Sequence, residues 1–292
     1  MSTIIPIQYL VPTDFSKQAE CALNHASTLA KKSGFSILLV HIIDSKTKDL
    51  IKKGDSTESQ LKVKLAAMVS EIKSSENVDA DYKLAEGRIF TSIGEVATEE
   101  KVNYIVMGTH GVKGMQHVLG AFALKVISSA PVPTIVVQSK GVKALGYDTI
   151  VYPVDDSKEN KHKLIHAISL ARIFNSTVHL LPTNPKESFL QKDLNLNMGY
   201  TKKNLEHNGV KFVECSPEDG DANNQENIMR YASKVNASLI LIRSYKEKKA
   251  KEYLVGPDSV KLINNLTETA VMCVNPIEDL FKIRSAVMLG SK

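Results

Sequence analysis

The chain has 292 residues, a length that predicts two domains of ordinary size. It is 43% hydrophobic, 24% charged and 6% aromatic with no tryptophan, so it fits a soluble globular class and offers little material for stacking bases or sugars. The net charge of +5 comes from interspersed Lys and Glu without a long single-sign block, so we expect no nucleic-acid partner.

Short apolar runs rich in β-branched residues alternate with helical patterns in the first half of the chain. Ser16 is a candidate N-cap and Gly34 a candidate stop for the first helix. The expected strands are 5–11, 36–43, 81–87, 103–108 and 133–139, and the expected helices are 16–33, 57–76, 92–101 and 119–130. Strands that alternate with helices predict a parallel sheet covered by helices on both faces.

The second half repeats this order of elements. Its expected strands are 148–153, 177–181, 211–215, 238–242 and 270–274, and its expected helices are about 157–175, 187–208, 223–236 and 256–266. Residues 139–147 contain two glycines and read as a linker. We therefore expect a first domain at 1–140, a second at 147–276 and a C-terminal tail at 277–292.

An internal repeat supports this division. A shift of 141 residues aligns the start of the two halves through the first strand and the first helix. The identical pairs are Pro12 and Pro153, Asp14 and Asp155, Ser16 and Ser157, Lys17 and Lys158, Leu23 and Leu164, His25 and His166, Ala26 and Ala167, Leu29 and Leu170, and Ala30 and Ala171. One register kept through a whole helix indicates a duplication.

Membrane, export and disulfide signals are weak. No apolar stretch approaches 18 residues, so no membrane-spanning helix is expected. The N-terminus lacks the basic and apolar regions of a signal peptide. Cys21, Cys215 and Cys273 are far apart and form no CxxC pair, which disfavours a disulfide framework or a zinc site. We expect a cytoplasmic protein.

A ligand in such a fold binds beyond the carboxyl ends of the strands, where the strand order reverses. This rule points to residues 11–14, 41–44 and 107–111. The third segment is rich in glycine, with Gly108, Gly111, Gly114 and Gly120 before or at the start of a predicted helix. Such a loop can cradle a phosphate with backbone N–H groups, or it can simply turn the chain. No GxxxxGK[ST] or GxGxxG motif occurs.

Together these segments resemble the universal stress protein family in its tandem form. The resembling segments are VPTDFS (11–16), VHIID (40–44), EGRI (86–89), VMGTHGVKG…LG (106–120) and PVPTIVV (131–137), and more weakly YPVDDS (152–157) and VGP…VKLI (255–263). The resemblance implies an α/β fold with two tandem doubly wound domains. Each would hold a five-stranded parallel sheet, with strand order 3-2-1-4-5, flanked by helices.

The resemblance also implies an ATP or AMP site, which family members carry when their loop reads G-x2-G-x9-G-[ST]. Pro12, Thr13 and Asp14 would meet the adenine and ribose, with Asp14 accepting from ribose hydroxyls, and Ile42 would pack on the base. The candidate residues of the loop are Met107, Gly108, His110, Gly111, Gly114, Gly120 and Ala121; of these Gly108, His110, Gly111 and Gly120 would surround the phosphates. Pairing of the two halves through their fifth strands, and a homodimer, are further implications.

This sequence departs from the family loop at two points. Eight residues rather than nine separate Gly111 from Gly120, and Ala121 replaces the Ser or Thr. One lost hydrogen bond to a charged group corresponds to about 1.5–3 kcal/mol, or roughly ten- to a hundred-fold in affinity. We expect weakened binding, absent binding or another ligand.

The second half departs further. Ile242-Arg243-Ser244-Tyr245 stands opposite the Gly108 loop, and Pro257 follows Gly256 and removes a donor. We expect Asp155 to cap the first helix of this half beside Ser157, the lysine-rich residues 246–251 to form a solvated face, and this half to be mainly structural.

Other candidates favour ordinary roles. His162 and His166 are four residues apart on a predicted helix but lack a third ligand, so they predict packing or surface positions rather than a metal site. Glu95, Glu99 and Glu100 predict a solvated helix face. No catalytic residue is assigned, although Asp14 could hold Mg²⁺ with ATP.

The leading hypothesis is a non-enzymatic stress-response protein with a regulatory adenine nucleotide bound in its first half. Two alternatives stay open. One is a weak ATPase or nucleotidyl-transfer enzyme at the same site, and the other is a scaffold without nucleotide.

Overall fold

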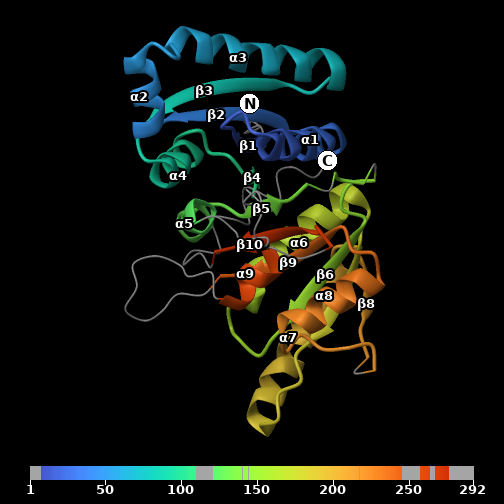
Figure 1. Cartoon of the computed structure of the whole chain (residues 1–292). Coiled ribbons are helices and arrows are strands. Elements are labelled where there is room, and N and C mark those ends of the chain that lie inside the picture. The colour runs from blue at the N-terminus through green and yellow to red at the C-terminus, as the bar shows by residue number, and fades with distance from the viewer. Residues whose placement is uncertain are drawn as a thin grey trace. The chain divides into compact units, whose positions relative to one another are not determined.

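The computed structural model describes residues 8–109, 121–139, 141–143, 145–216, 218–244, 257–263 and 267–275. The chain divides between Gly141 and Val142 into two compact units (Figure 1). Each unit is a parallel β-sheet with helices on its faces, which confirms the predicted α/β class.

The sheet of the first unit contains five parallel strands. They are β1 (Gln8–Pro12), β2 (Ser36–Ile43), β3 (Ala80–Glu86), β4 (Tyr104–Gly108) and β5 (Thr134–Val137). Their order across the sheet is β3-β2-β1-β4-β5, as expected. The order reverses between β1 and β4, because the chain first moves outward through β2 and β3 and then returns to the other side of β1.

The helices of this unit follow from that path. They are α1 (Lys17–Ser33), α2 (Ser45–Lys53), α3 (Glu58–Glu71), the π-helix η1 (Ile72–Glu76), α4 (Ile89–Glu99) and α5 (Ala121–Ser129). Right-handed crossovers place α1 and α3 on one face of the sheet and α4 and α5 on the other. The contacts agree, since α1 touches η1 and α4 packs against α5.

The first helix begins and ends where the sequence predicts. The Ser16 side chain accepts a hydrogen bond from the Ala19 backbone N–H, which satisfies one of the unpaired donors at the helix start. Gly34 ends the helix with a φ of 72°, a left-handed conformation that glycine adopts without steric penalty. The apolar stripe that includes Ala22, Ala26 and Leu29 is buried against the sheet.

Two elements of this unit differ from the sequence prediction. Helix α2 was not predicted, because none of its residues is buried and it has no apolar stripe to recognise. Its two ends are capped. The Asp44 side chain accepts a hydrogen bond from the Thr47 N–H, and Gly54 ends the helix in a left-handed conformation with a φ of 80°. The helix predicted at 57–76 is α3 followed by the π-turns of η1, so its last five residues are wound more widely than expected.

The second unit repeats the arrangement. Its strands are β6 (Thr149–Val154), β7 (Thr177–Pro182), β8 (Lys211–Glu214), β9 (Leu239–Arg243) and β10 (Ala270–Val274), in the order β10-β9-β6-β7-β8. Its helices are α6 (Asn160–Phe174), α7 (Ser188–His207), α8 (Gln225–Lys234) and α9 (Pro257–Ile263). Helix α6 packs with α7 and α8 packs with α9, which is the same division between two faces.

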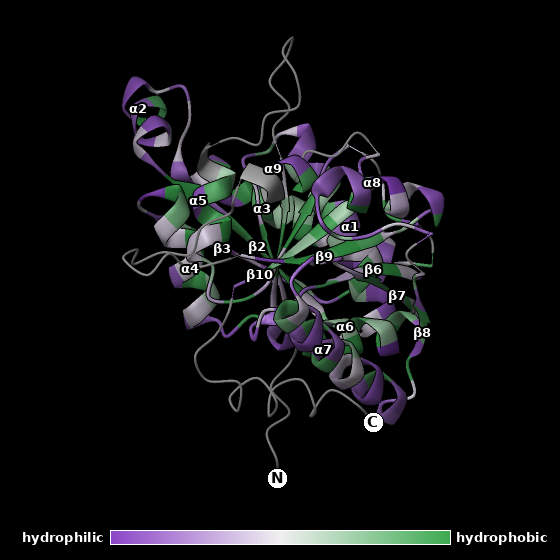
Figure 2. Ribbon diagram, turned by 90° about the horizontal axis from the view of Figure 1, so that it is seen from below, coloured by the Kyte–Doolittle hydropathy of each residue, from purple (hydrophilic) through white to green (hydrophobic). Residues whose placement is uncertain are grey.

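The core of each unit lies between the sheet and its helices. Seven of the eight residues of β2 are buried, as in a strand covered on both faces. Figure 2 shows the strands in the green of apolar residues and large parts of α1, α2 and α8 in the purple of polar ones. Among the described residues, no helix is long and apolar enough to cross a membrane.

Candidate functional site

The carboxyl ends of β1, β2 and β4 meet at the point where the strand order reverses. Strand β1 pairs with β2 on one side and with β4 on the other. The structure therefore brings together six of the candidate residues from three distant segments. These are Pro12 at the end of β1, Thr13 and Asp14 directly after it, Ile42 in β2, and Met107 and Gly108 at the end of β4.

The other candidates are not placed at this edge. His110, Gly111, Gly114 and Gly120 lie outside the residues that the structure describes. Ala121 is the first residue of α5. The described part of the candidate site is therefore the edge of the sheet where β1, β2 and β4 end.

The turn between β1 and α1 is held by its own side chains. Its backbone stays paired to β2 through the Thr13 N–H, which donates to the Val40 carbonyl at 2.8 Å. The Phe15 N–H donates to Thr13 Oγ1 at 3.1 Å, and the Ser16 N–H donates to Asp14 Oδ1 at 3.0 Å. Phe15 is left-handed with a φ of 62°, which is unusual for an aromatic residue. These bonds fix an exposed Asp14 carboxylate at the end of the strand.

A buried histidine braces the same turn, and the sequence prediction gave it no role. His41 is 7% exposed, and its Nδ1 lies 2.8 Å from the Thr13 carbonyl oxygen. A carbonyl oxygen only accepts, so Nδ1 carries the proton. The imidazole lies 4.8 Å from the Phe15 ring, centroid to centroid. The only sequence signal for this residue is a polar side chain inside the otherwise apolar strand β2.

Close packing requires glycine at position 108, independently of any ligand. A Cβ at this position would lie 2.2 Å from the backbone carbonyl oxygen of Gln18 in the first turn of α1. A backbone atom cannot move aside as a flexible side chain can, so α1 and the end of β4 approach this closely only with glycine here. The glycine at 108 is thus required by the fold whether or not a phosphate binds beside it.

The equivalent edge of the second unit is occupied by its own charges. Arg243 ends β9 as Gly108 ends β4, and it donates from Nη2 and Nε to Asp155 Oδ2 at 3.1 and 3.3 Å. The N–H and hydroxyl of Ser157 donate to the other oxygen, Oδ1. Both oxygens of the carboxylate that corresponds to Asp14 are therefore engaged within the protein.

This pairing corrects the prediction that Asp155 caps the first helix of the second half. Helix α6 begins at Asn160 rather than near 157, and its N-cap residue Glu159 makes no side-chain capping bond. The Asp155 carboxylate faces Arg243 and the Ser157 turn instead. The Ser157 hydroxyl donates to Asp155, and the Asn160 N–H at the start of α6 donates to the Ser157 backbone carbonyl oxygen at 3.2 Å.

A buried lysine completes this cluster. Lys163 is 2% exposed; its ammonium donates to the Pro153 carbonyl and lies 4.5 Å from the centre of the Tyr152 ring. Burial lowers the pKa of Lys163 to about 8, although the nearby Asp155 carboxylate opposes the change. The repeat aligns Lys163 with Ala22, which is buried in the first unit.

The charges around Asp155 oppose the effect of burial on the pKa of its carboxyl group. Burial alone would raise the pKa of this carboxyl group, but Lys163 and Arg243 together with hydrogen bonds bring the pKa below its ordinary value. Asp155 therefore stays ionised and neutralises part of the positive charge around it. Among the described residues, no group of three His, Cys, Asp or Glu side chains is arranged to hold a metal ion.

Comparisons with known proteins agree with the repeat and the fold. A family model described as the universal stress protein family matches residues 8–138 and 146–274. The universal stress protein MJ0577 of Methanocaldococcus jannaschii is 30% identical over 152 residues, which cover 45% of this chain and 94% of that protein. A second protein of that organism, universal stress protein MJ0531, is 28% identical over 139 residues, covering 44% of this chain and 80% of that protein.

The fold has a match over nearly the whole chain. The crystal structure of a universal stress protein from Archaeoglobus fulgidus aligns with a TM-score of 0.74 and 16% identity, covering 92% of this chain and 98% of that one. At this identity the match supports the tandem fold alone.

Proposed function

Because the chain belongs to the universal stress protein family, we propose that its first unit binds an adenine nucleotide as a regulatory ligand in a stress response. The nucleotide would lie at the carboxyl ends of β1, β2 and β4, with Asp14 accepting hydrogen bonds from the ribose and Ile42 against the base. The second unit would bind none. The protein would act by binding rather than by catalysis.

One observation carries the proposal. Residues from three distant segments, including Asp14, Ile42 and Gly108, converge on the reversal point of the strand order, where α/β folds of this kind hold their ligands. The Asp14 side chain is exposed there and its orientation is fixed by the Ser16 N–H. A fixed carboxylate loses little conformational entropy when it accepts from a ribose hydroxyl.

The second unit supports the expected stoichiometry. In that unit the corresponding carboxylate, Asp155, already pairs with Arg243. A ribose hydroxyl would have to replace a charge-assisted pair with a neutral hydrogen bond, which is the weaker interaction. One nucleotide per chain is therefore the expected result.

Equilibrium dialysis of the purified full chain against ATP and AMP, with and without Mg²⁺, tests the proposal. The informative variant is Asp14→Asn, because the amide oxygen can still accept from the Ser16 N–H and preserve the turn while the charge is removed. Asp49→Asn is the matched control, since it removes an exposed carboxylate of α2 in the same unit.

We expect one saturable site per chain, and about ten- to a hundred-fold weaker binding in Asp14→Asn. Asp49→Asn should bind as the wild type does. Absence of saturable binding, or equal binding by Asp14→Asn, would contradict the proposal and favour a scaffold that uses no nucleotide. ATP turnover measured in the same samples separates a regulatory ligand from a substrate.

A further inference from the structure

The turn that carries Asp14 is held by a side chain of the neighbouring strand. His41 lies in β2, which pairs with β1, and its Nδ1 donates to the Thr13 carbonyl oxygen at 2.8 Å. Thr13 directly precedes Asp14. Its N–H donates to the Val40 carbonyl oxygen and its hydroxyl accepts from the Phe15 N–H, so its N–H, carbonyl and hydroxyl groups all have partners. These bonds fix the direction in which the chain leaves β1.

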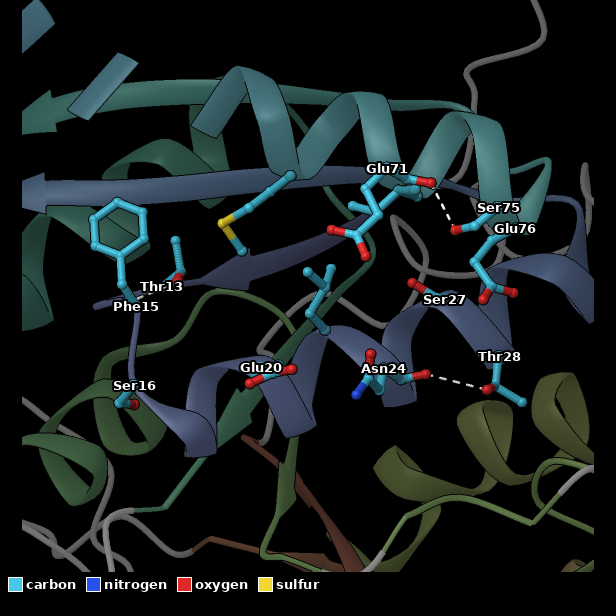
Figure 3. Close-up of a pocket in the computed structure, with 13 residues that line it drawn as sticks. Thr13, Phe15, Ser16, Glu20, Asn24, Ser27, Thr28, Glu71, Ser75 and Glu76 are labelled. Atoms are coloured by element: carbon cyan, nitrogen blue, oxygen red, sulfur yellow. Dashed lines mark hydrogen bonds between the residues drawn. The ribbon is translucent and has the colours of Figure 1, made fainter. Parts of the chain in front are cut away.

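The turn needs support, because Phe15 has an unfavourable backbone conformation. Its φ of 62° is left-handed, and a residue with a Cβ stays in this conformation only where its surroundings hold it. The His41 imidazole lies 4.8 Å from the Phe15 ring, and the Lys64 ammonium of α3 lies 5.5 Å from the centre of the same ring. Figure 3 shows Thr13, Phe15 and Ser16 together before the first turn of α1. His41 therefore supports the turn through a hydrogen bond and through a ring contact.

The second ring nitrogen of His41 is left unpaired. Nε2 is buried and has no hydrogen-bond partner among the described residues. A buried polar atom without a partner costs free energy, so this nitrogen offsets part of what the bond from Nδ1 contributes to the stability of the fold. Global stability is therefore a weak reason for a histidine at position 41. The contact with Thr13 is the stronger reason.

The second unit lacks this arrangement. The repeat aligns His41 with Pro182, whose side chain has no hydrogen-bond donor. It aligns Phe15 with Asp156, which does not have a positive φ. In that unit the equivalent carboxylate, Asp155, is already engaged in an ion pair. The brace thus occurs in the unit with the exposed carboxylate and is missing from the other unit.

We propose that His41 is a positioning residue for the candidate nucleotide site of the first unit. It holds the turn, before any ligand binds, in the geometry from which the Asp14 carboxylate accepts hydrogen bonds from a ribose. A turn that is ordered in advance loses little conformational entropy on binding, so His41 raises the affinity without contacting the ligand. The proposal rests on nucleotide binding by the first unit and adds the residue that prepares its site.

Three substitutions at position 41 separate the hydrogen bond from packing. His41→Asn keeps the donor, because the amide nitrogen of asparagine is bonded to Cγ as Nδ1 of histidine is. His41→Gln places the same amide one carbon further from the backbone, and His41→Leu has no donor. His207→Asn is the matched control, since His207 is an exposed histidine of α7 in the second unit.

The first measurement is amide hydrogen exchange of the full chain by NMR, without nucleotide. The Phe15 and Ser16 N–H groups bond within the turn, and in His41→Leu and His41→Gln they should exchange about three- to ten-fold faster than in the wild type. In His41→Asn and His207→Asn they should exchange as in the wild type. The N–H groups of β9 in the second unit should keep their rates in all variants, which controls for the fold.

The second measurement is equilibrium dialysis with ATP and AMP. His41→Leu and His41→Gln should bind about three- to ten-fold more weakly than the wild type, and the other two variants should bind as the wild type does. Unchanged exchange or unchanged affinity in His41→Leu would overturn the proposal. An equal loss in His41→Asn and His41→Leu would also overturn it, because packing would then explain the effect. If the wild type binds no nucleotide, the proposed function fails, and the exchange rates alone decide whether His41 positions the turn.

Discussion

The buried lysine of the second unit makes a sharp prediction about pH. Holding Lys163 charged in the fold is unfavourable, since its pKa of about 8 compares with an ordinary value of 10.5. The difference corresponds to about 3 kcal/mol. Lys163→Met removes this penalty but leaves the Pro153 carbonyl without its donor, which costs about 1–3 kcal/mol. At pH 7 the variant should therefore be as stable as the wild type, or more stable by about 1–2 kcal/mol.

The pH dependence of the free energy of unfolding separates the effect of Lys163 ionisation from the other effects of the substitution. Below pH 8 the lysine is charged in both the folded and the unfolded chain, and it gives no slope. Between about pH 8 and 10.5 the unfolded chain keeps a proton that the folded chain has released, so the free energy of unfolding rises with pH. From pH 7 to pH 9 this rise amounts to about 1 kcal/mol, and Lys163→Met should lack it.

Urea unfolding at pH 7 and pH 9, followed by circular dichroism and fitted separately for each transition, measures the difference. Lys158→Met is the control, because Lys158 is exposed and close in sequence. Wild type and Lys158→Met should each gain about 1 kcal/mol more than Lys163→Met over this interval. An equal gain in all three proteins would refute the reasoning, since it would show that Lys163 titrates as an ordinary solvated lysine.

Two further substitutions test the strand ends. Gly108→Ala places a Cβ 2.2 Å from the Gln18 carbonyl oxygen and should lower the free energy of unfolding by about 1–3 kcal/mol, whereas Gly141→Ala meets open space and should change it by less than about 0.5 kcal/mol. Urea unfolding at pH 7 compares them, and equal stabilities would contradict the close approach. Arg243→Leu should lower stability at pH 7 by about 1–3 kcal/mol, because Asp155 loses two hydrogen bonds. The depressed pKa of Asp155 stabilises the fold above its ordinary value of 3.8, and this contribution is lost as the pH falls through the folded pKa. The deficit of Arg243→Leu should therefore shrink between pH 5 and pH 3, and a deficit independent of pH would contradict the ion pair.

The sequence predicted the fold because both of its strong signals are local. Strand β2 is an apolar run interrupted by His41, and α1 combines an apolar stripe with the Ser16 cap and the Gly34 stop. Such patterns depend on residues close together in the chain. Helix α2 was not predicted because it buries no residue and therefore lacks an apolar stripe. Its capping residues are the only pattern that marks it in the sequence.

The convergence of the candidate residues was predictable, but the contacts around them were not. The reversal of strand order places the segments that carry Asp14, Ile42 and Gly108 at one edge of the sheet without any coordinates. The brace of His41 on Thr13 and the contact of Gly108 with α1 join residues far apart in sequence, and no local pattern encodes them.

The second unit shows why a repeated residue need not keep its role. Asp14 and Asp155 occupy the same place in the repeat, yet one is exposed and the other pairs with Arg243, 88 residues away. Lys163 is buried close by, so removing the Asp155 charge would leave two cations without compensation in a partly buried site. The structure alone thus gives a reason to keep aspartate at 155. Identity between the two halves at this position is evidence of common folding, and evidence of a shared ligand has to come from the groups around it.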